Sequence, residues 1–205
     1  MDDQLLECFP RKNEVIRKGL WSKGERNILC VGINPNTANE LKLDSTTANV
    51  EKIAQLNGYD GWFLVNLYPV RSSSVSSLDK EPVRELMWEN LRFIANLMSA
   101  NQFGFDKIWV AWGNDIESGD HTYLLECAYY LSRILSRFDM GYVCIGVNKY
   151  TKHPTHPSPQ AIAGKYRGDY SKTVFQPFDM EDYAKMIKNR IKVEPDIAID
   201  GIEFK

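Results

Sequence analysis

Four short apolar runs, separated by segments with helical periodicity, constrain the fold more than any other feature of the sequence. They cover residues 27–31 (NILCV), 62–67 (WFLVNL), 107–112 (KIWVAW) and 142–147 (YVCIGV). Runs that are apolar almost throughout are typical of strands buried on both faces. Their alternation with helices usually produces βα units. We therefore predict an α/β fold, a three-layer sandwich with a mainly parallel central sheet of about four strands.

Helical patterns fill the gaps between these runs. Residues 44–46 (DST) offer N-cap candidates before an apolar face, and a second pattern begins near Pro82. Two further patterns cover residues 122–137 and 181–191. The first thirty residues and the tail after Val193 lack a clear period, so we expect them to pack at the edges of the core.

Length and composition are those of one globular domain. With 205 residues and 43% hydrophobic content, the chain can bury a full core, so we predict a single domain over 1–205 whose motifs lie within about 27–165. The formal net charge of −2 excludes a globally basic surface for duplex DNA. A local stripe can still contact phosphates, and it consists of Lys149, Lys152, Lys165 and Arg167.

The sequence also predicts the cellular location of the protein and the state of its cysteines. It begins without the basic start and apolar run of a signal peptide, and no stretch approaches the roughly 18 to 20 apolar residues of a membrane span. We expect no membrane partner and a cytoplasmic location. The cysteines are far apart and form no C-x-x-C pair, which favours buried thiols over disulfides or zinc ligands; they are Cys8, Cys30, Cys127 and Cys144.

Polar residues follow each apolar run. In open α/β sheets, ligands bind beyond the carboxyl ends of the strands, so these residues are the first place to look for a site. The runs lead into GINPNTA at 32–38, NLYPVR at 66–71, WGND at 112–115 and HPTHPSPQ at 153–160. We expect these segments to meet at one edge of the sheet.

This ordered set resembles the motifs of the uracil-DNA glycosylase superfamily. GINP is similar to the first motif of its mismatch-specific thymine/uracil branch, and FLVN ends in an asparagine as the next strand of that superfamily does. VAWG and HPSP are similar to its later motifs. The chain also resembles a bacterial and phage family of uncharacterised function that shares N-P-x-T-A, D-x-T, N-L-x-x-x-R, W-G and a late H-P. A uracil-DNA glycosylase-like fold is the expectation that follows.

The resemblance implies roles for individual residues. Asn34 is expected to orient a water molecule, and His156 to donate a hydrogen bond to a carbonyl oxygen of the base. Asn66 offers a paired donor and acceptor that can read a pyrimidine edge. The same motifs place further residues against the substrate, namely Gly32, Ile33, Pro35, Asn36, Tyr68, Ser158 and Gln160.

Two charged residues have alternative interpretations. Asp44 is either the helix cap at residues 44–46 or the ionisable base nearest the first motif. Arg71, just beyond a strand end, is either a bidentate phosphate clamp or a solvated loop residue.

Three features differ from the glycosylase pattern. Asn36 stands where uracil-specific members carry a tyrosine that blocks the methyl group of thymine, and Gln160 stands where an apolar wedge would enter the base stack. The aromatic residue that stacks on the base has only two candidates, Tyr68 and Phe63. The polar residue at the wedge position disfavours base flipping from a duplex, and the three differences together disfavour a role in DNA repair.

The leading hypothesis is therefore a hydrolase of the N-glycosidase type that acts on a base in single-stranded DNA, in a modified nucleotide or in a free nucleoside. One alternative is a non-catalytic module that binds nucleotides or nucleic acid. Another is a hydrolase of a different small phosphorylated metabolite, with Asp44 as base and Arg71 as clamp. No cofactor is expected. No metal is expected either, because prolines after His153 and His156 prevent the helix that would align the two rings.

Overall fold

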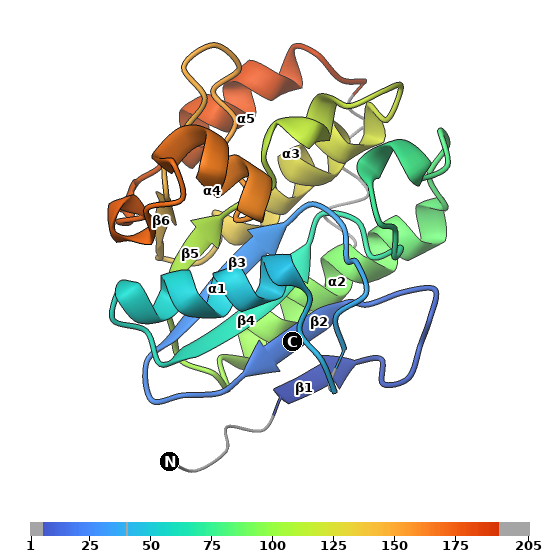
Figure 1. The fold of residues 1–205 in the computed structure, drawn as a ribbon. Coiled ribbons are helices and arrows are strands. Elements are labelled where there is room, and N and C mark those ends of the chain that lie inside the picture. Colours follow the sequence, from blue (N-terminus) through green and yellow to red (C-terminus); the bar gives the residue numbers. More distant parts are fainter. Residues whose placement is uncertain (1–5, 40, 193–205) are drawn as a thin grey trace.

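The computed structural model describes residues 6–39 and 41–192. Its centre is a seven-stranded sheet in the order β1-β2-β4-β3-β5-β6-β7 (Figure 1). The strands are β1 (Leu6–Phe9), β2 (Gly19–Ser22), β3 (Asn27–Gly32), β4 (Gly61–Asn66), β5 (Phe105–Val110), β6 (Gly141–Cys144) and β7 (Gln176–Pro177). The four middle strands, β4, β3, β5 and β6, run parallel, and the outer pairings are antiparallel.

The α/β class is as predicted, but the sheet differs from the prediction in size and direction. The four predicted strands form its middle, and three more strands flank them, so that three of its six pairings are antiparallel. The added strands have two to four residues each. Such short edge strands do not produce a long apolar run, and this is why the sequence pattern missed them.

In the described part of the chain, five α-helices cover the two faces of the sheet. They are α1 (Ser45–Leu56), α2 (Arg84–Ala100), α3 (Tyr123–Leu135), α4 (Pro159–Tyr166) and α5 (Met180–Lys188). Helices α1 and α4 lie on one face, and α2, α3 and α5 on the other (Figure 1). Alternate residues of β3 separate the two cores: Ile28 and Cys30 pack toward α1, whereas Leu29 and Val31 pack toward α2 and α3.

The helices agree with the sequence patterns except for α4, whose eight residues follow a proline-rich segment that reads as a loop. Three short 3-10 helices occupy Val75–Ser77, Asn114–Glu117 and Tyr170–Lys172. The four cysteines are buried and form no disulfide within the described residues, as predicted. Residues 6–22 contribute the edge strands β1 and β2, and the tail after Val193 lies outside the described residues. Within the described ranges, no helix has the length and apolar character needed to span a membrane.

Candidate pocket at the carboxyl ends of the central strands

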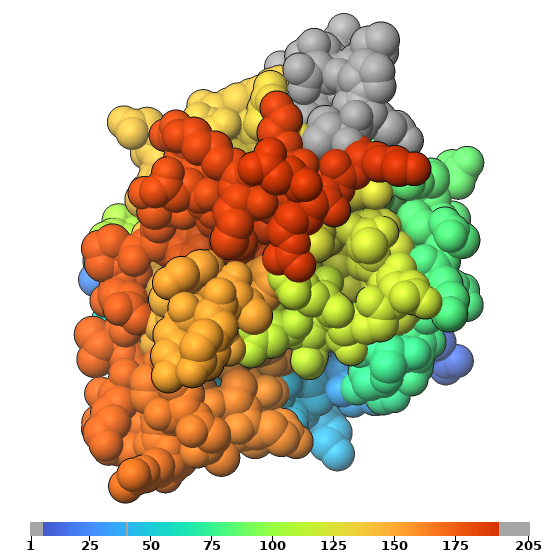
Figure 2. All heavy atoms as spheres, turned by 90° about the horizontal axis from the view of Figure 1, so that it is seen from above, coloured from blue at the N-terminus to red at the C-terminus, as the bar shows by residue number. Residues whose placement is uncertain are grey.

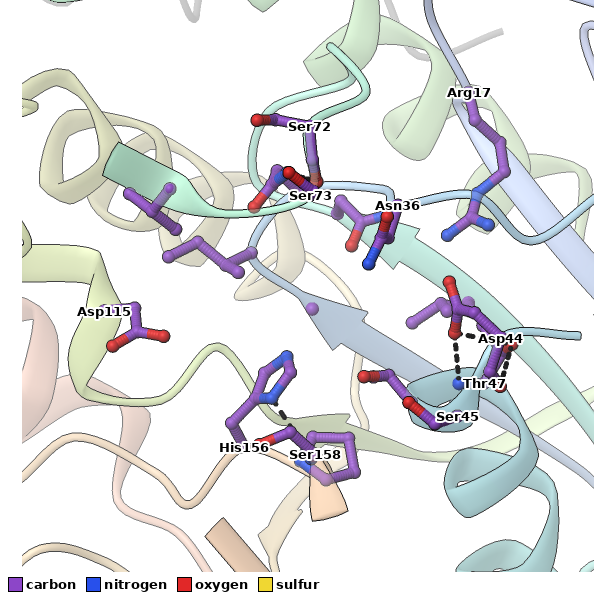
Figure 3. A pocket seen from close by; sticks show the side chains of 18 of the residues that line it. Arg17, Asn36, Asp44, Ser45, Thr47, Ser72, Ser73, Asp115, His156 and Ser158 are labelled. Atoms are coloured by element: carbon purple, nitrogen blue, oxygen red, sulfur yellow. Dashed lines mark hydrogen bonds between the residues drawn. The ribbon is translucent and has the colours of Figure 1, made fainter. Parts of the chain in front are cut away.

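A pocket of about 380 Å³ opens beyond the carboxyl ends of β3 and β4 (Figure 3). The predicted residues that line it are Gly32, Ile33, Asn34, Asn36, Asp44, Asn66, His156, Ser158 and Gln160. Residues not predicted from the sequence complete the lining, and they are Arg17, Ser45, Thr46, Thr47, Leu64, Ser72, Ser73, Val75, Asp115 and Pro157. Three predicted residues, Pro35, Tyr68 and Arg71, are not part of it.

The pairing of β3 with β4 brings Gly32 and Asn66 together on the pocket wall. The two residues are partners in the parallel register, and a Cβ atom on Gly32 would lie 2.6 Å from Oδ1 of Asn66. Only glycine leaves room for this side chain. Asn66 is 3% exposed, and its Nδ2 has no hydrogen-bond partner among the described residues. A buried amide donor without a partner costs free energy, so this atom marks where a ligand can bind.

Asn34 is held by the backbone around it. Its Nδ2 donates to the carbonyl oxygens of Pro35, at 3.2 Å, and Ser72, at 3.0 Å. Since an amide has two N–H groups, these bonds use both, and Oδ1 is the atom left to accept a hydrogen bond from a ligand or a water molecule.

His156 faces the pocket as a neutral ring. The backbone N–H of Ser158 donates to Nδ1 at 3.2 Å, which leaves the proton on Nε2. Burial lowers the pKa of His156 to about 4, and the carboxylates of Asp115 and Asp44 oppose this shift only in part. At neutral pH the ring is therefore an uncharged N–H donor.

The Trp112-Gly113 pair sets the position of His156. Gly113 has a φ of +76°, and a Cβ atom there would lie 2.7 Å from Cβ of His156. Trp112 is buried, and its indole N–H donates to the hydroxyl of Tyr183 at 2.9 Å. The tryptophan is thus a packing residue, while the glycine permits the close approach of the histidine loop.

His153 belongs to a separate buried network. Its Nδ1 lies 2.8 Å from the hydroxyl of Tyr183, and its Nε2 lies 2.5 Å from Oε1 of Glu117, which also bonds Arg190. Burial lowers the pKa of His153, and the hydrogen bond from Arg190 lowers that of Glu117. Both ring nitrogens of His153 are used inside the protein, so His153 anchors the loop that carries His156.

Asp44 is the N-cap of α1. Its Oδ1 accepts the backbone N–H of Thr47 at 2.9 Å and the Thr47 hydroxyl at 3.0 Å, while its Oδ2 accepts the N–H of Ala38 at 3.2 Å. Of the two interpretations that the sequence left open, this geometry favours the cap.

Asp115 is the second carboxylate on the pocket, and sequence reasoning missed it. It lies in the 3-10 helix Asn114–Glu117 and points into the pocket near His156 (Figure 3). Among the described residues its carboxylate has no hydrogen-bond or ion-pair partner, and the side chain is exposed. An acidic residue two positions after the strand-end WG is the sequence signal that could have identified it.

Two arginines converge on the carbonyl oxygen of Ala38. Nη1 of Arg17 and Nη1 of Arg71 both donate to it at 2.9 Å. Arg71 also donates to the carbonyl oxygens of Asn36, at 2.7 Å, and Asn13, at 2.9 Å. Through these bonds Arg71 supports the 36–38 turn. Its side chain lines a neighbouring hollow and not the pocket. Arg17 does line the pocket; it comes from the loop between β1 and β2, which contains none of the motifs found in the sequence.

The predicted stacking residues lie elsewhere in the molecule. Tyr68 and Phe63 are buried in the core on the α2 and α3 face of the sheet. None of the described residues that line the pocket is a phenylalanine, tyrosine or tryptophan, and its apolar wall comes from Ile33, Leu64 and Val75. A base in this pocket would therefore pack against aliphatic side chains.

The polar groups fall at two ends of the pocket (Figure 3). We call Arg17, Asn36 and Asp44 the arginine end, and Asp115 and His156 the histidine end. A hollow of about 680 Å³ adjoins the histidine end, with segments 113–115 and 147–158 side by side on the face seen in Figure 2. Two lysines of the predicted basic stripe line this hollow, Lys149 and Lys165.

The fold and the pocket define an α/β protein with a polar pocket at the carboxyl edge of a mixed sheet. A family model described as a protein of unknown function, DUF1643, matches residues 17–158. This is more than half of the chain, and the protein belongs to that family. The matched segment runs from Arg17 to Ser158 and so contains every described pocket residue except Gln160. Searches of curated proteins and of solved structures found no match.

Proposed function

We propose that the pocket binds the base and sugar of a nucleotide and hydrolyses the N-glycosidic bond between them. The observation that carries this proposal is the convergence on one pocket of Asn34 and Asn66, from the ends of β3 and β4, and His156, from the loop between β6 and α4. Its volume of about 380 Å³ falls in the range of small-ligand sites. The order of the motifs, which resembles that of uracil-DNA glycosylases, and the helices on both faces of the sheet also support it.

The available hydrogen-bonding atoms match a base. Nδ2 of Asn66 is an unpartnered donor, and Nε2–H of His156 is an uncharged one. Two such donors suit the two carbonyl oxygens of uracil or thymine, or the carbonyl oxygen and a ring nitrogen of hypoxanthine. His156 becomes more important as the bond breaks, because negative charge then develops on the departing base. A donor placed in advance stabilises this charge more than it stabilises the neutral substrate.

Hydrolysis also requires a water molecule on the sugar side. In the proposed reaction the water oxygen bonds to C1′, the C1′–N bond breaks, and its electron pair leaves with the base. Oδ1 of Asn34 orients the water, and the carboxylate of Asp115 accepts its proton. Asp115 replaces Asp44 as the proposed base, since both oxygens of Asp44 already accept hydrogen bonds from the protein.

A glycosylase assay tests this proposal. Single- and double-stranded oligonucleotides carrying uracil, mismatched thymine or hypoxanthine, and the matching nucleosides and nucleotides, are incubated with the protein, and free base is measured. Base release that His156→Ala and Asn34→Ala both abolish is the expected result. Asn96→Ala, on the exposed side of α2, is the matched control and should act like the wild type.

A non-catalytic binding module is the second candidate. Asn34 in the GINP turn favours it, because an amide cannot take a proton from water as a carboxylate can. Calorimetric titration with the same ligands separates the two candidates. Binding that His156→Ala weakens, with no base released from any substrate, would establish the binding module. If the protein neither bound any of these ligands nor released a base, both candidate functions would be overturned.

A further inference from the structure

The wall at the arginine end holds a buried positive charge whose hydrogen bonding is incomplete. Arg17 is 1% exposed. Its Nη1 donates to the carbonyl oxygen of Ala38 at 2.9 Å, but its Nε has no partner among the described residues. A guanidinium group carries five N–H donors, and a buried donor without an acceptor is costly. A ligand that supplies acceptor oxygens would remove this cost.

The charges around Arg17 do not cancel. Arg71 shares the same carbonyl acceptor, and Asp44 is the single carboxylate that acts on Arg17 in the described part of the chain. Burial and the neighbouring Arg71 lower the pKa of Arg17 to about 10, so its guanidinium stays charged at neutral pH. Two guanidinium groups face one carboxylate, which leaves one positive charge for an anionic ligand to neutralise.

The amino end of α1 lies on the same side of the pocket. Ser45, Thr46 and Thr47 all line it, and the first turn of this twelve-residue helix has no acidic side chain. Asp44 caps the N–H of Thr47, whereas the N–H groups of Ser45 and Thr46 are among those that a helix leaves without an internal partner. Such an end attracts anions through its free N–H groups and its dipole. Figure 3 shows Arg17 directed toward this helix end.

We propose that the arginine end is a phosphate subsite, in which Arg17 and the amino end of α1 hold the phosphate of the ligand while its base lies toward the histidine end. The base assignment rests on the proposed function; the phosphate assignment rests on Arg17 and α1 alone. The phosphate comes either from a nucleoside monophosphate or from a phosphodiester of a single strand. The ligand is thus a nucleotide and not a free base or nucleoside.

The test uses a substitution that adds charge without removing the protein's own contacts. Ser45→Glu places a carboxylate in the first turn of α1, where it favours the helix and repels a phosphate. Ser45→Gln has the same shape without the charge. Gln55→Glu adds the same charge to an exposed position at the other end of α1. Circular dichroism should show that all three variants fold.

Binding is measured by calorimetry with inorganic phosphate, the common nucleosides, their 5′-monophosphates and a short single-stranded oligonucleotide. The wild type should bind at least one monophosphate about tenfold or more tightly than its nucleoside. Ser45→Glu should remove this gain, Ser45→Gln should lose less of it, and Gln55→Glu should keep it. A gain seen only with the oligonucleotide, and lost in the same variant, assigns the phosphate to a strand.

Failure of this inference is distinguishable from failure of the proposed function. Phosphate binding that Ser45→Glu weakens and His156→Gln leaves unchanged would support the subsite even if no base were recognised. Equal affinities for nucleoside and nucleotide, with no binding of inorganic phosphate or the oligonucleotide, would overturn it. An equal loss in Ser45→Glu and Gln55→Glu would also overturn it, because the effect would then come from net charge alone.

Discussion

The two ends of the pocket use their polar groups in opposite ways. At the arginine end, Asp44 caps α1 and accepts the N–H of Ala38, and Arg17 donates to the carbonyl oxygen of the same residue. At the histidine end, Asp115 has no partner for its carboxylate among the described residues, and His156 keeps Nε2–H for the pocket. The first end fixes charges in place, and the second leaves reactive atoms available.

This difference follows from how each end is supported. The arginine end takes its rigidity from its own side chains, because Arg17 and Asp44 both bond the backbone of Ala38 directly. The histidine end takes its rigidity from the residues behind it, Gly113 and the network of His153 with Glu117. A site that must exchange protons needs side chains free of structural bonds, so we place the chemistry at the histidine end and anion binding at the arginine end.

The largest effect on the rate of base release should come from Asp115→Asn, with Asp44→Asn as the comparison at the other end of the pocket. Asp115→Asn should slow base release about 100-fold or more, because general-base catalysis typically contributes at least that much. Asp44→Asn should have a much smaller effect, since asparagine is an equally good helix cap. Single-turnover rates on the best substrate measure both. Greater loss in Asp44→Asn would reverse the assignment of the two ends.

Gly113→Ala should cause the next largest effect, on stability. The residue would have a positive φ and a Cβ atom 2.7 Å from Cβ of His156, and we expect a loss of about 2 kcal/mol or more in the free energy of unfolding. Gly104→Ala is the control, because Gly104 also has a positive φ, +56°, but no atom near its Cβ position. Its loss should be about 1 kcal/mol. Urea denaturation compares them, and equal losses would mean that the contact with His156 is not tight.

Asp44→Ala should have a smaller effect on stability. It removes the cap of α1 and the acceptor for the N–H of Ala38, and the expected loss is about 1 to 2 kcal/mol. Asp44→Asn should restore only the part due to the cap, because Nδ2 of asparagine cannot accept the N–H of Ala38. The same urea titration measures it, and an unchanged or increased stability in Asp44→Ala would show that the carboxylate is held for function at a cost to the fold.

The sequence predicted the parts of the fold and site that depend on local pattern. Four apolar runs became the parallel middle of the sheet, and the rule that ligands bind at strand ends led to Asn34, Asn66 and His156. The edge strands were missed because two to four residues carry no usable periodicity.

Arg17 and Asp115 show why the rest of the site could not be predicted. Arg17 enters the pocket only because β2 pairs antiparallel with β4. This pairing brings the loop before β2 next to Ala38, which lies 21 residues after Arg17 in the sequence. Asp115 becomes relevant only when the histidine loop, some 40 residues later in the chain, packs on Gly113. Contacts of this kind depend on tertiary structure and leave no local pattern in the sequence. For Arg71 the position after a strand end suggested a phosphate clamp, and its bonds to three carbonyl oxygens could not be foreseen.

The smallest effect should be the pH dependence of the histidine end above pH 5. The pKa of His156 is lowered from 6.5 to about 4, so at pH 5 only about a tenth of the folded protein carries a charged ring. Binding of a single-stranded oligonucleotide, whose phosphodiesters keep their charge over this range, should therefore be nearly constant from pH 8 to pH 5. Stability behaves differently, because the unfolded chain takes up the proton near pH 6.5 while the folded one resists it until about pH 4. The contribution of His156 to the free energy of unfolding is therefore fully present above pH 6.5 and declines as the pH falls toward 4. The measurement is the difference in unfolding free energy between the wild type and His156→Gln at each pH, which isolates the contribution of this ring. A difference that did not change between pH 7 and pH 4.5 would mean that the ring is open to solvent, and the contrast between a fixed arginine end and a desolvated histidine end would lose its basis.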